Sequence, residues 1–122
     1  MKIENFEQLM VWQKAIDFSV LIYQETDHYP KSEQFGITNQ LRRASSSISA
    51  NIAEGFGRRS IKDKFHFYTI AYGSLLESKS FLHLSSKLGY SSTNVESILK
   101  EATNLQMLLN AFLKSTKELY DR

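Results

Sequence analysis

The chain has 122 residues, of which 42% are hydrophobic, and a formal net charge of +2. This length fits one domain with a buried core, and the hydrophobic content together with a single proline argues against disorder. The absence of cysteine excludes a disulfide framework, a thiolate metal site and a cysteine nucleophile. No apolar run approaches the ~18–20 residues that span a bilayer, and the N-terminus lacks a signal-peptide core. A cytoplasmic protein that does not enter the membrane is therefore expected.

The first helix is expected from about Phe6 to Asp27, and Pro30 lies in the stretch that stops it. Two neighbouring lines of apolar side chains follow the helical period, so the apolar face is wide, as in a bundle helix. The first line contains Val11, Ala15, Phe18 and Ile22, and the second contains Trp12, Ile16, Val20 and Tyr23.

The second helix is expected to start at Thr38, as its N-cap, and to end at Gly55, because glycine adopts a positive φ at no steric cost. Beside its apolar stripe, roughly 80–90° round the helix, runs a line of polar side chains. We call this line, with an acidic partner from the third helix, the polar seam. Its members are Gln40, Arg43, Ser47, Asn51, Glu54 and Glu77.

The third helix is expected from Ser60, which forms a capping box with Asp63, to about Leu88, before Gly89. It is apolar on two sides, and a helix of this kind needs partners on both. One side fits the core of the chain itself. The other side predicts a contact with a second subunit, so a homo-oligomer is expected. This second side contains Ile70, Phe81, Leu84 and Leu88.

A glycine in the middle of the third helix, Gly73, costs about 0.8–1 kcal/mol relative to alanine. A close approach of another helix would compensate this cost. The small side chains of residues 44–47 on the second helix could supply the facing surface. We therefore predict that the second and third helices touch at Gly73 and Ser74.

The fourth helix follows residues 91–93 and carries a heptad seam with one threonine interruption. Four amphipathic helices with short connections, and no strand candidate, predict an all-α fold, an antiparallel up-down-up-down four-helix bundle. No repeat or linker interrupts the chain, so residues 1–122 are expected to form one domain. The seam contains Val95, Ile98, Ala102, Leu105, Leu109, Phe112, Thr116 and Leu119.

Basic residues concentrate around the end of the second helix. Residues 42–64 hold six basic and two acidic residues, which leaves nine basic and eleven acidic residues elsewhere. Exposed N–H groups at the start of the third helix lie among these charges and favour an anion site. The alternative is that the side chains are solvated or pair with acids elsewhere. The candidate anion- or nucleic-acid-binding residues are Arg42, Arg58, Arg59, Lys62 and Lys64.

The sequence offers little that indicates catalysis. His28, His66 and His83 lack the spacing of metal ligands, so no metal and no cofactor are expected. Glu54 and Glu77 could face each other inside the bundle and perform acid–base work, but each is better explained as an acceptor for an arginine, an asparagine or a backbone donor. Because no nucleophile–base pair or cofactor motif accompanies them, a non-enzymatic protein is expected.

Three segments and a late L-G-Y at residues 88–90 resemble the family of four-helix bundle proteins encoded in intervening sequences of bacterial 23S rRNA genes. The segments are F-E-Q-L-M-V-W-Q-K-A (6–15), F-G-I-T-N-Q-L-R-R-A-S-S-S-I-S-A-N-I-A-E-G (35–55) and I-A-Y-G-S-L-L-E-S-K (70–79). The resemblance implies a four-helix protomer and a homopentameric ring or barrel. It also implies kinship with the accessory proteins of diversity-generating retroelements, which are basic pentamers that bind nucleic acid and a reverse transcriptase.

Two functions remain open at this point. The first is a self-assembling accessory protein that binds structured RNA or DNA, or a ribonucleoprotein, and the basic segment favours it. The second is an oligomeric scaffold that binds a protein partner without nucleic acid. The apolar outer side of the third helix is compatible with both.

Overall fold

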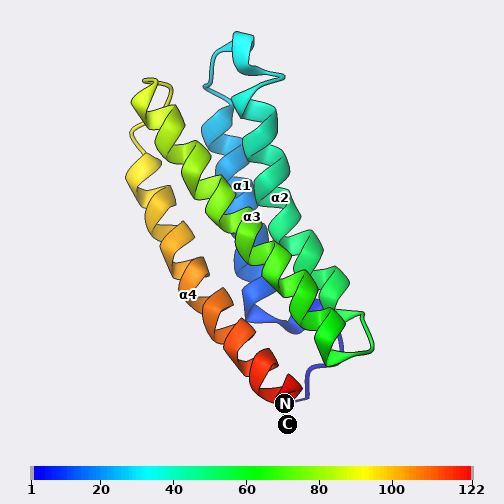
Figure 1. Cartoon of the computed structure of the whole chain (residues 1–122). Helices are drawn as coiled ribbons and strands as arrows, with labels where there is room; N and C mark the ends of the chain where they lie inside the picture. The colour runs from blue at the N-terminus through cyan, green and yellow to red at the C-terminus, as the bar shows by residue number, and fades with distance from the viewer. Residues whose placement is uncertain (1, 122) are drawn as a thin grey trace.

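The computed structural model describes residues 2–121, except for the side chain of Tyr120. The described residues form four α-helices and two short 3-10 turns and contain no strand, so the predicted all-α fold is confirmed. Figure 1 shows the helices side by side, with the α1–α2 and α3–α4 connections at one end of the bundle and the α2–α3 connection at the other. The elements are η1 (Phe6–Gln8), α1 (Met10–Thr26), η2 (Lys31–Glu33), α2 (Ile37–Phe56), α3 (Ile61–Lys87) and α4 (Val95–Tyr120).

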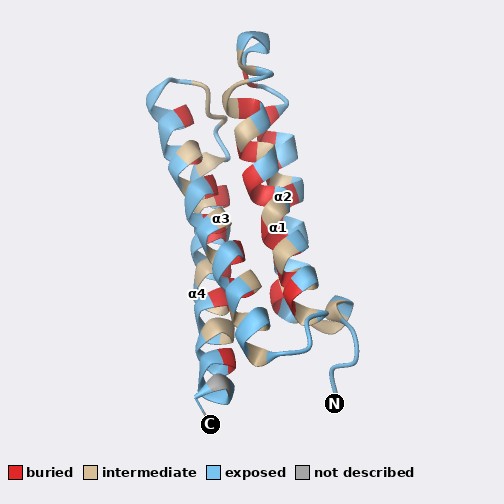
Figure 2. Ribbon diagram, turned by 45° about the vertical axis from the view of Figure 1, so that its right-hand side comes forward, coloured by how far each residue is buried: buried red, intermediate tan, exposed pale blue. Residues whose placement is uncertain are grey.

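The core is built from one apolar line of each helix. Phe18 of α1, Ile48 of α2, Leu75 of α3 and Leu105 of α4 are all fully buried in it. Figure 2 shows buried residues recurring along each helix, with exposed residues on the outer side. The first predicted line of α1 and the middle of the predicted α4 seam belong to this core, because their spacing keeps them on one face of a helix.

The second apolar line of α1 lies largely outside the core, although Trp12 packs against it. Ile16, Val20 and Tyr23 are 36%, 50% and 46% exposed. The prediction of a wide buried face on α1 is therefore wrong, because α2 and α4 pack against the first line and leave the second uncovered. The three exposed side chains line a shallow surface groove of about 420 Å³, which we call the α1 groove.

The outer side of α3 also keeps apolar side chains in solvent. Ile70, Leu84 and Leu88 are 39%, 46% and 49% exposed, whereas Phe81 packs partly against the core. We call the line along this side the α3 stripe, defined by Ile70, Gly73, Glu77, Phe81, Leu84 and Leu88.

The ends of α2 differ from prediction. Its N-cap is Gly36, and Thr38 is buried inside the first turn. At the other end the helix continues through Gly55 to Phe56, and among the described residues only Gly89 has a positive φ. Gly55 is needed for a different reason, because α3 crosses the helix there. A Cβ on Gly55 would lie 2.7 Å from Cε1 of Tyr68.

Both ends of α3 agree with prediction. Of the predicted capping box, the structure shows the bond in which the Ser60 side chain accepts from the N–H of Asp63 at 3.0 Å, and this bond caps the helix. At the other end Gly89 has a φ of 80°, and the N–H of Tyr90 returns to the carbonyl of Ser85 at 2.9 Å. This reversal satisfies carbonyls that a helix end leaves without partners.

A buried carboxylate ties the α3–α4 connection to α1. Glu25 is 3% exposed, and its two oxygens accept from the N–H of Ser92, at 3.0 Å, and from the Ser92 hydroxyl. Nearby, the Tyr90 hydroxyl donates to Glu33 at 3.0 Å, and the Tyr90 ring lies 5.9 Å from that of Tyr29. These contacts hold the two connections at this end of the bundle against each other.

Replacing Glu25 by alanine is expected to lower the free energy of unfolding by about 2–3 kcal/mol, because the partly buried donors of Ser92 lose a charged acceptor. Urea denaturation followed by circular dichroism measures this change. The matched control is Glu101→Ala on an exposed position of α4, which should stay within about 0.5 kcal/mol of the wild type. Equal effects of the two substitutions would show that the Glu25 contact does not stabilise the fold.

Candidate functional site

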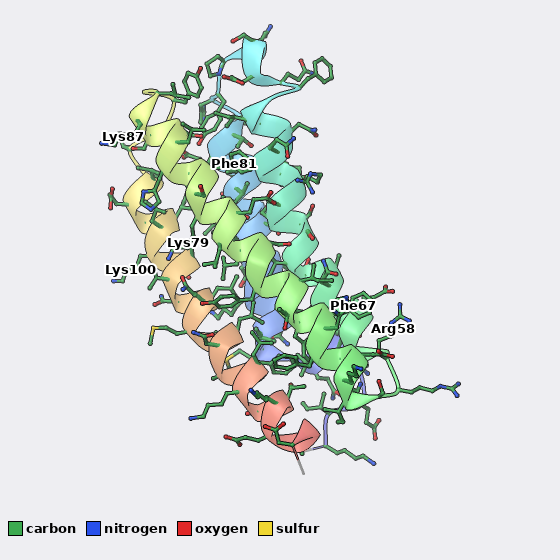
Figure 3. All side chains as sticks on the ribbon, in the orientation of Figure 1. Arg58, Phe67, Lys79, Phe81, Lys87 and Lys100 are labelled. Atoms are coloured by element: carbon green, nitrogen blue, oxygen red, sulfur yellow. The ribbon has the colours of Figure 1, made fainter. Side chains whose placement is uncertain are left out.

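Basic side chains gather at the turn between α2 and α3, but two of them are engaged within the chain. Arg58 donates to Glu54 at 2.8 Å and lies 4.6 Å from the centroid of the Phe67 ring, at the end of the bundle where Figure 3 labels Arg58 and Phe67. The ammonium group of Lys64 donates to the carbonyl of Phe56 at 2.6 Å, and burial lowers the pKa of Lys64. Arg58 and Lys64 therefore stabilise the turn, and their charges are partly compensated.

Arg59 and Lys62 project from the same turn into solvent. Within residues 2–121 neither side chain takes part in an ion pair. Their charges add to the positive potential at the start of α3. Asp63, in the first turn of that helix, opposes them. The turn is therefore a weakly basic surface rather than an enclosed phosphate pocket.

The structure does not bring Arg42 together with the other four candidate residues. Arg42 lies near the start of α2, about 21 Å along the helix axis from Phe56, where α2 ends two residues before Arg58. It donates to the hydroxyl of Thr26 at 2.8 Å and to Asp27 at 3.1 Å, and it lies 4.7 Å from the centroid of the Tyr23 ring. These contacts fasten α2 to the end of α1.

The polar seam runs along the contact between α2 and α3. The hydroxyl oxygen of Ser47 accepts from the side-chain amide of Asn51 at 2.9 Å and from the hydroxyl of Ser74 at 3.1 Å. Arg43 donates to the side chain of Gln40 at 2.9 Å. The Ser74 bond crosses between the helices, so this residue, which was predicted only as a small contact residue, completes the seam.

The two acidic members of the seam pair with different arginines. Glu54 pairs with Arg58 at 2.8 Å, and Glu77 lies 3.7 Å from Arg43. Their side chains are 53% and 43% exposed. The hypothesis that Glu54 and Glu77 meet in the bundle interior is wrong, because each carboxylate pairs with a different arginine and is about half exposed to solvent.

Gly73 does not serve the contact between α2 and α3. It is exposed, and a Cβ built on it would meet no heavy atom within 4 Å. The prediction that Gly73 touches α2 is wrong, because the residue lies on the outer side of α3, and the close approach of the two helices occurs at Gly55 instead.

Sequence reasoning missed the polar group around Glu25. A signal for it exists, because Glu25 follows Ile22 by three residues and so continues the core line of α1. The hydroxyls of Tyr29, Ser85 and Ser91 are also buried, and none has a hydrogen-bond partner in the described part of the chain. Burial raises the pKa of Tyr29, and the nearby Glu25 carboxylate adds to this shift.

In the part of the chain that the structure describes, no group of three or more histidine, aspartate or glutamate side chains could hold a metal ion. His28, His66 and His83 are all exposed. No helix within residues 2–121 combines the length and the apolar character that crossing a bilayer requires.

These features define a small four-helix bundle protein whose outer surface, rather than an enclosed pocket, carries the candidate sites. The family model described as 23S rRNA-intervening sequence protein matches residues 7–111, and the chain belongs to this family.

The fold is similar to the crystal structure of a protein of unknown function from the S23 ribosomal protein family of Bacteroides thetaiotaomicron. The TM-score is 0.76 at 28% sequence identity, and the similarity covers 86% of this chain and 99% of that one. No match was found among curated proteins. The family resemblance predicted from the sequence segments is thus confirmed, and neither the family description nor the similar structure indicates an enzymatic activity.

Proposed function

We propose that this protein is a non-enzymatic, self-assembling accessory of structured RNA or DNA, or of a ribonucleoprotein. Its protomer is an antiparallel up-down-up-down bundle, and five protomers form a homopentamer. The observation that carries the proposal is the apolar surface that the protomer leaves uncovered, in the α1 groove and the α3 stripe. Apolar surfaces of this kind are typical of protein interaction sites. The number five rests on the family resemblance, which implies a homopentameric ring or barrel.

Assembly changes what the weakly basic turn can do. One chain has a net charge of only +2 and two unpaired basic side chains at the α2–α3 turn, Arg59 and Lys62, among its described residues. A ring repeats this turn in every subunit. A nucleic acid that reaches several turns at once then binds with an avidity that no single turn provides.

The mass in solution tests the assembly. A pentamer has a mass of about 70 kDa, five times the 14.1 kDa of the chain, and light scattering combined with native mass spectrometry measures it. A monomer at micromolar concentration would contradict self-assembly.

Replacing both Arg59 and Lys62 by alanine is expected to weaken binding to a structured RNA hairpin and to flatten its salt dependence. Each lost phosphate contact should reduce the slope of log affinity against log salt by about 1. Fluorescence anisotropy over a salt series measures the slope. The control is Lys100→Ala, which removes a charge from an exposed position of α4 away from the turn. An unchanged slope in the double variant would exclude the turn as the binding surface.

If the wild-type protein binds neither RNA nor DNA at ~50 mM salt, the second candidate function applies, a scaffold that binds a protein partner. The exposed apolar side chains on the outer side of α3 favour this candidate. Co-purification from a nuclease-treated lysate distinguishes the two functions, because a protein partner of the scaffold survives nuclease treatment.

A further inference from the structure

The protomer gives no reason for the glycine at position 73. Glycine lowers helix stability relative to alanine, yet Gly73 lies well inside the 27-residue helix α3. Gly55 is explained by the close approach of Tyr68, and Gly89 by its positive φ. Gly73 has neither feature, and a Cβ at this position would enter open space. A single protomer would therefore accept alanine here.

The surroundings of Gly73 are those of an uncovered helix contact. Ile70 lies on the same side of the helix three residues earlier, and the α3 stripe continues through Phe81, which Figure 3 labels, to Leu84. Because Gly73 has no side chain, the surface of α3 is recessed between these larger side chains. Such a recess allows the backbone of another helix to come close.

The α1 groove provides a second apolar face of the same chain. The backbones of α1 and α3 do not come close to each other in the described structure, and the two helices flank α2, which packs against both. Val20 of the groove lies ten residues after the start of α1, and Gly73 lies twelve residues after the start of α3. At the rise of an α-helix these distances are about 15 and 18 Å, and both helices start at the same end of the bundle. The two faces therefore lie at similar heights.

The charges of the two faces are also compatible. Arg42 pairs with Asp27 at 3.1 Å, and both residues line the α1 groove. Glu77, the one charged member of the α3 stripe, pairs with Arg43 at 3.7 Å. Each face thus carries one ion pair within the chain, so neither offers a net charge to attract a charged partner. Each of the two faces therefore fits an apolar partner surface without net charge. A second copy of this chain carries such a surface in its own α1 groove and α3 stripe.

We infer that the α3 stripe of one copy packs into the α1 groove of a second copy, with Gly73 where the two helices come closest. This inference rests on the proposed self-assembly and adds which surfaces meet. The contact joins two different faces, so every subunit uses one face for each neighbour. Repeated contacts of this type close into a ring when the rotation between subunits permits it. The same contact covers the apolar side chains that the isolated protomer leaves in water.

Substitution of Gly73 tests the contact through the assembly. Gly73→Leu is expected to weaken subunit association about tenfold to a hundredfold, because the added side chain fills the space of the approaching helix. Analytical ultracentrifugation of the full chain measures the dissociation constant. The matched control is Asn110→Leu, which adds the same side chain at an exposed position of α4 and should leave association unchanged.

Cysteine cross-linking tests which faces meet, and the chain offers a clean background because it has no cysteine. Copies with Val20→Cys mixed with copies with Ile70→Cys are expected to form disulfide-linked dimers under oxidising conditions. Copies with Val20→Cys mixed with Asn110→Cys copies should not. An oligomer that shows no such cross-link, and whose dissociation constant does not change with Gly73→Leu, would overturn this inference and leave the proposed self-assembly intact. A wild-type protein that stays monomeric would overturn both.

Discussion

Replacing Phe18 by alanine is expected to lower the free energy of unfolding by about 3–5 kcal/mol. The Phe18 ring lies in the centre of the core, where it is fully buried in the same cluster as Ile22 of α1 and Leu105 of α4. Truncation removes most of the side chain, and packed helices close the resulting cavity only in part. Urea denaturation followed by circular dichroism at equal protein concentration measures the loss.

A conservative variant and a surface variant keep this prediction testable if Phe18→Ala does not fold. Phe18→Leu retains most of the volume and should cost less than half as much. Lys14→Ala, on an exposed position of the same helix, should change the free energy of unfolding by no more than about 0.5 kcal/mol. A Phe18→Leu variant as stable as the wild type would show that the ring is not tightly packed.

Replacing Gly55 by leucine is expected to lower the free energy of unfolding by about 3 kcal/mol, and Gly55→Ala by about 1–2 kcal/mol. The added Cβ would lie 2.7 Å from Cε1 of Tyr68 and 2.9 Å from Cβ of Phe67. The Tyr68 ring cannot easily give way, because it is buried and packs 4.5 Å from the Phe112 ring. The clash therefore outweighs the gain in helix propensity of about 1 kcal/mol that alanine brings.

The control for this prediction is Gly57→Ala. A Cβ on Gly57 would make an ordinary contact of 3.6 Å with the carbonyl oxygen of Glu54, and the φ of Gly57 is −78°. This variant should be as stable as the wild type or slightly more stable. Greater stability of Gly55→Ala would show that α2 and α3 do not approach each other closely at this point.

The ionisation of Tyr68 gives a second measure of the same contact. Burial raises the pKa of Tyr68 to about 12. A ring pushed toward water by Gly55→Ala should ionise closer to its ordinary value of about 10. The pKa of Tyr68 is higher in the folded state than in the unfolded state. The contribution of the neutral Tyr68 phenol to the free energy of unfolding is therefore complete below pH 10 and is lost as the pH rises through 12. Phenolate absorbance, with Tyr68→Phe as the reference, follows this titration.

The basic turn shows how far sequence alone reaches toward a site. Arg58, Arg59, Lys62 and Lys64 are neighbours in the sequence, and a turn keeps sequence neighbours together in space. Arg42 precedes them by a whole helix, and a rigid helix separates its two ends by its length. Which of these charges are already engaged depends on neighbours such as Glu54, Phe67 and the Phe56 carbonyl, and helix periodicity does not reveal these partners.

The sequence by itself determined the four helices, the core line of each helix and the cap at Ser60, because 3.6-residue periodicity and capping chemistry act over a few neighbouring residues. Only the tertiary structure decided that Ile16 and Val20 stay exposed, that Gly55 rather than Gly73 receives a neighbouring helix, and that Glu25 is buried against Ser92. These outcomes depend on where one helix crosses another. That position is set by the packing of side chains far apart in the chain, which no local pattern encodes.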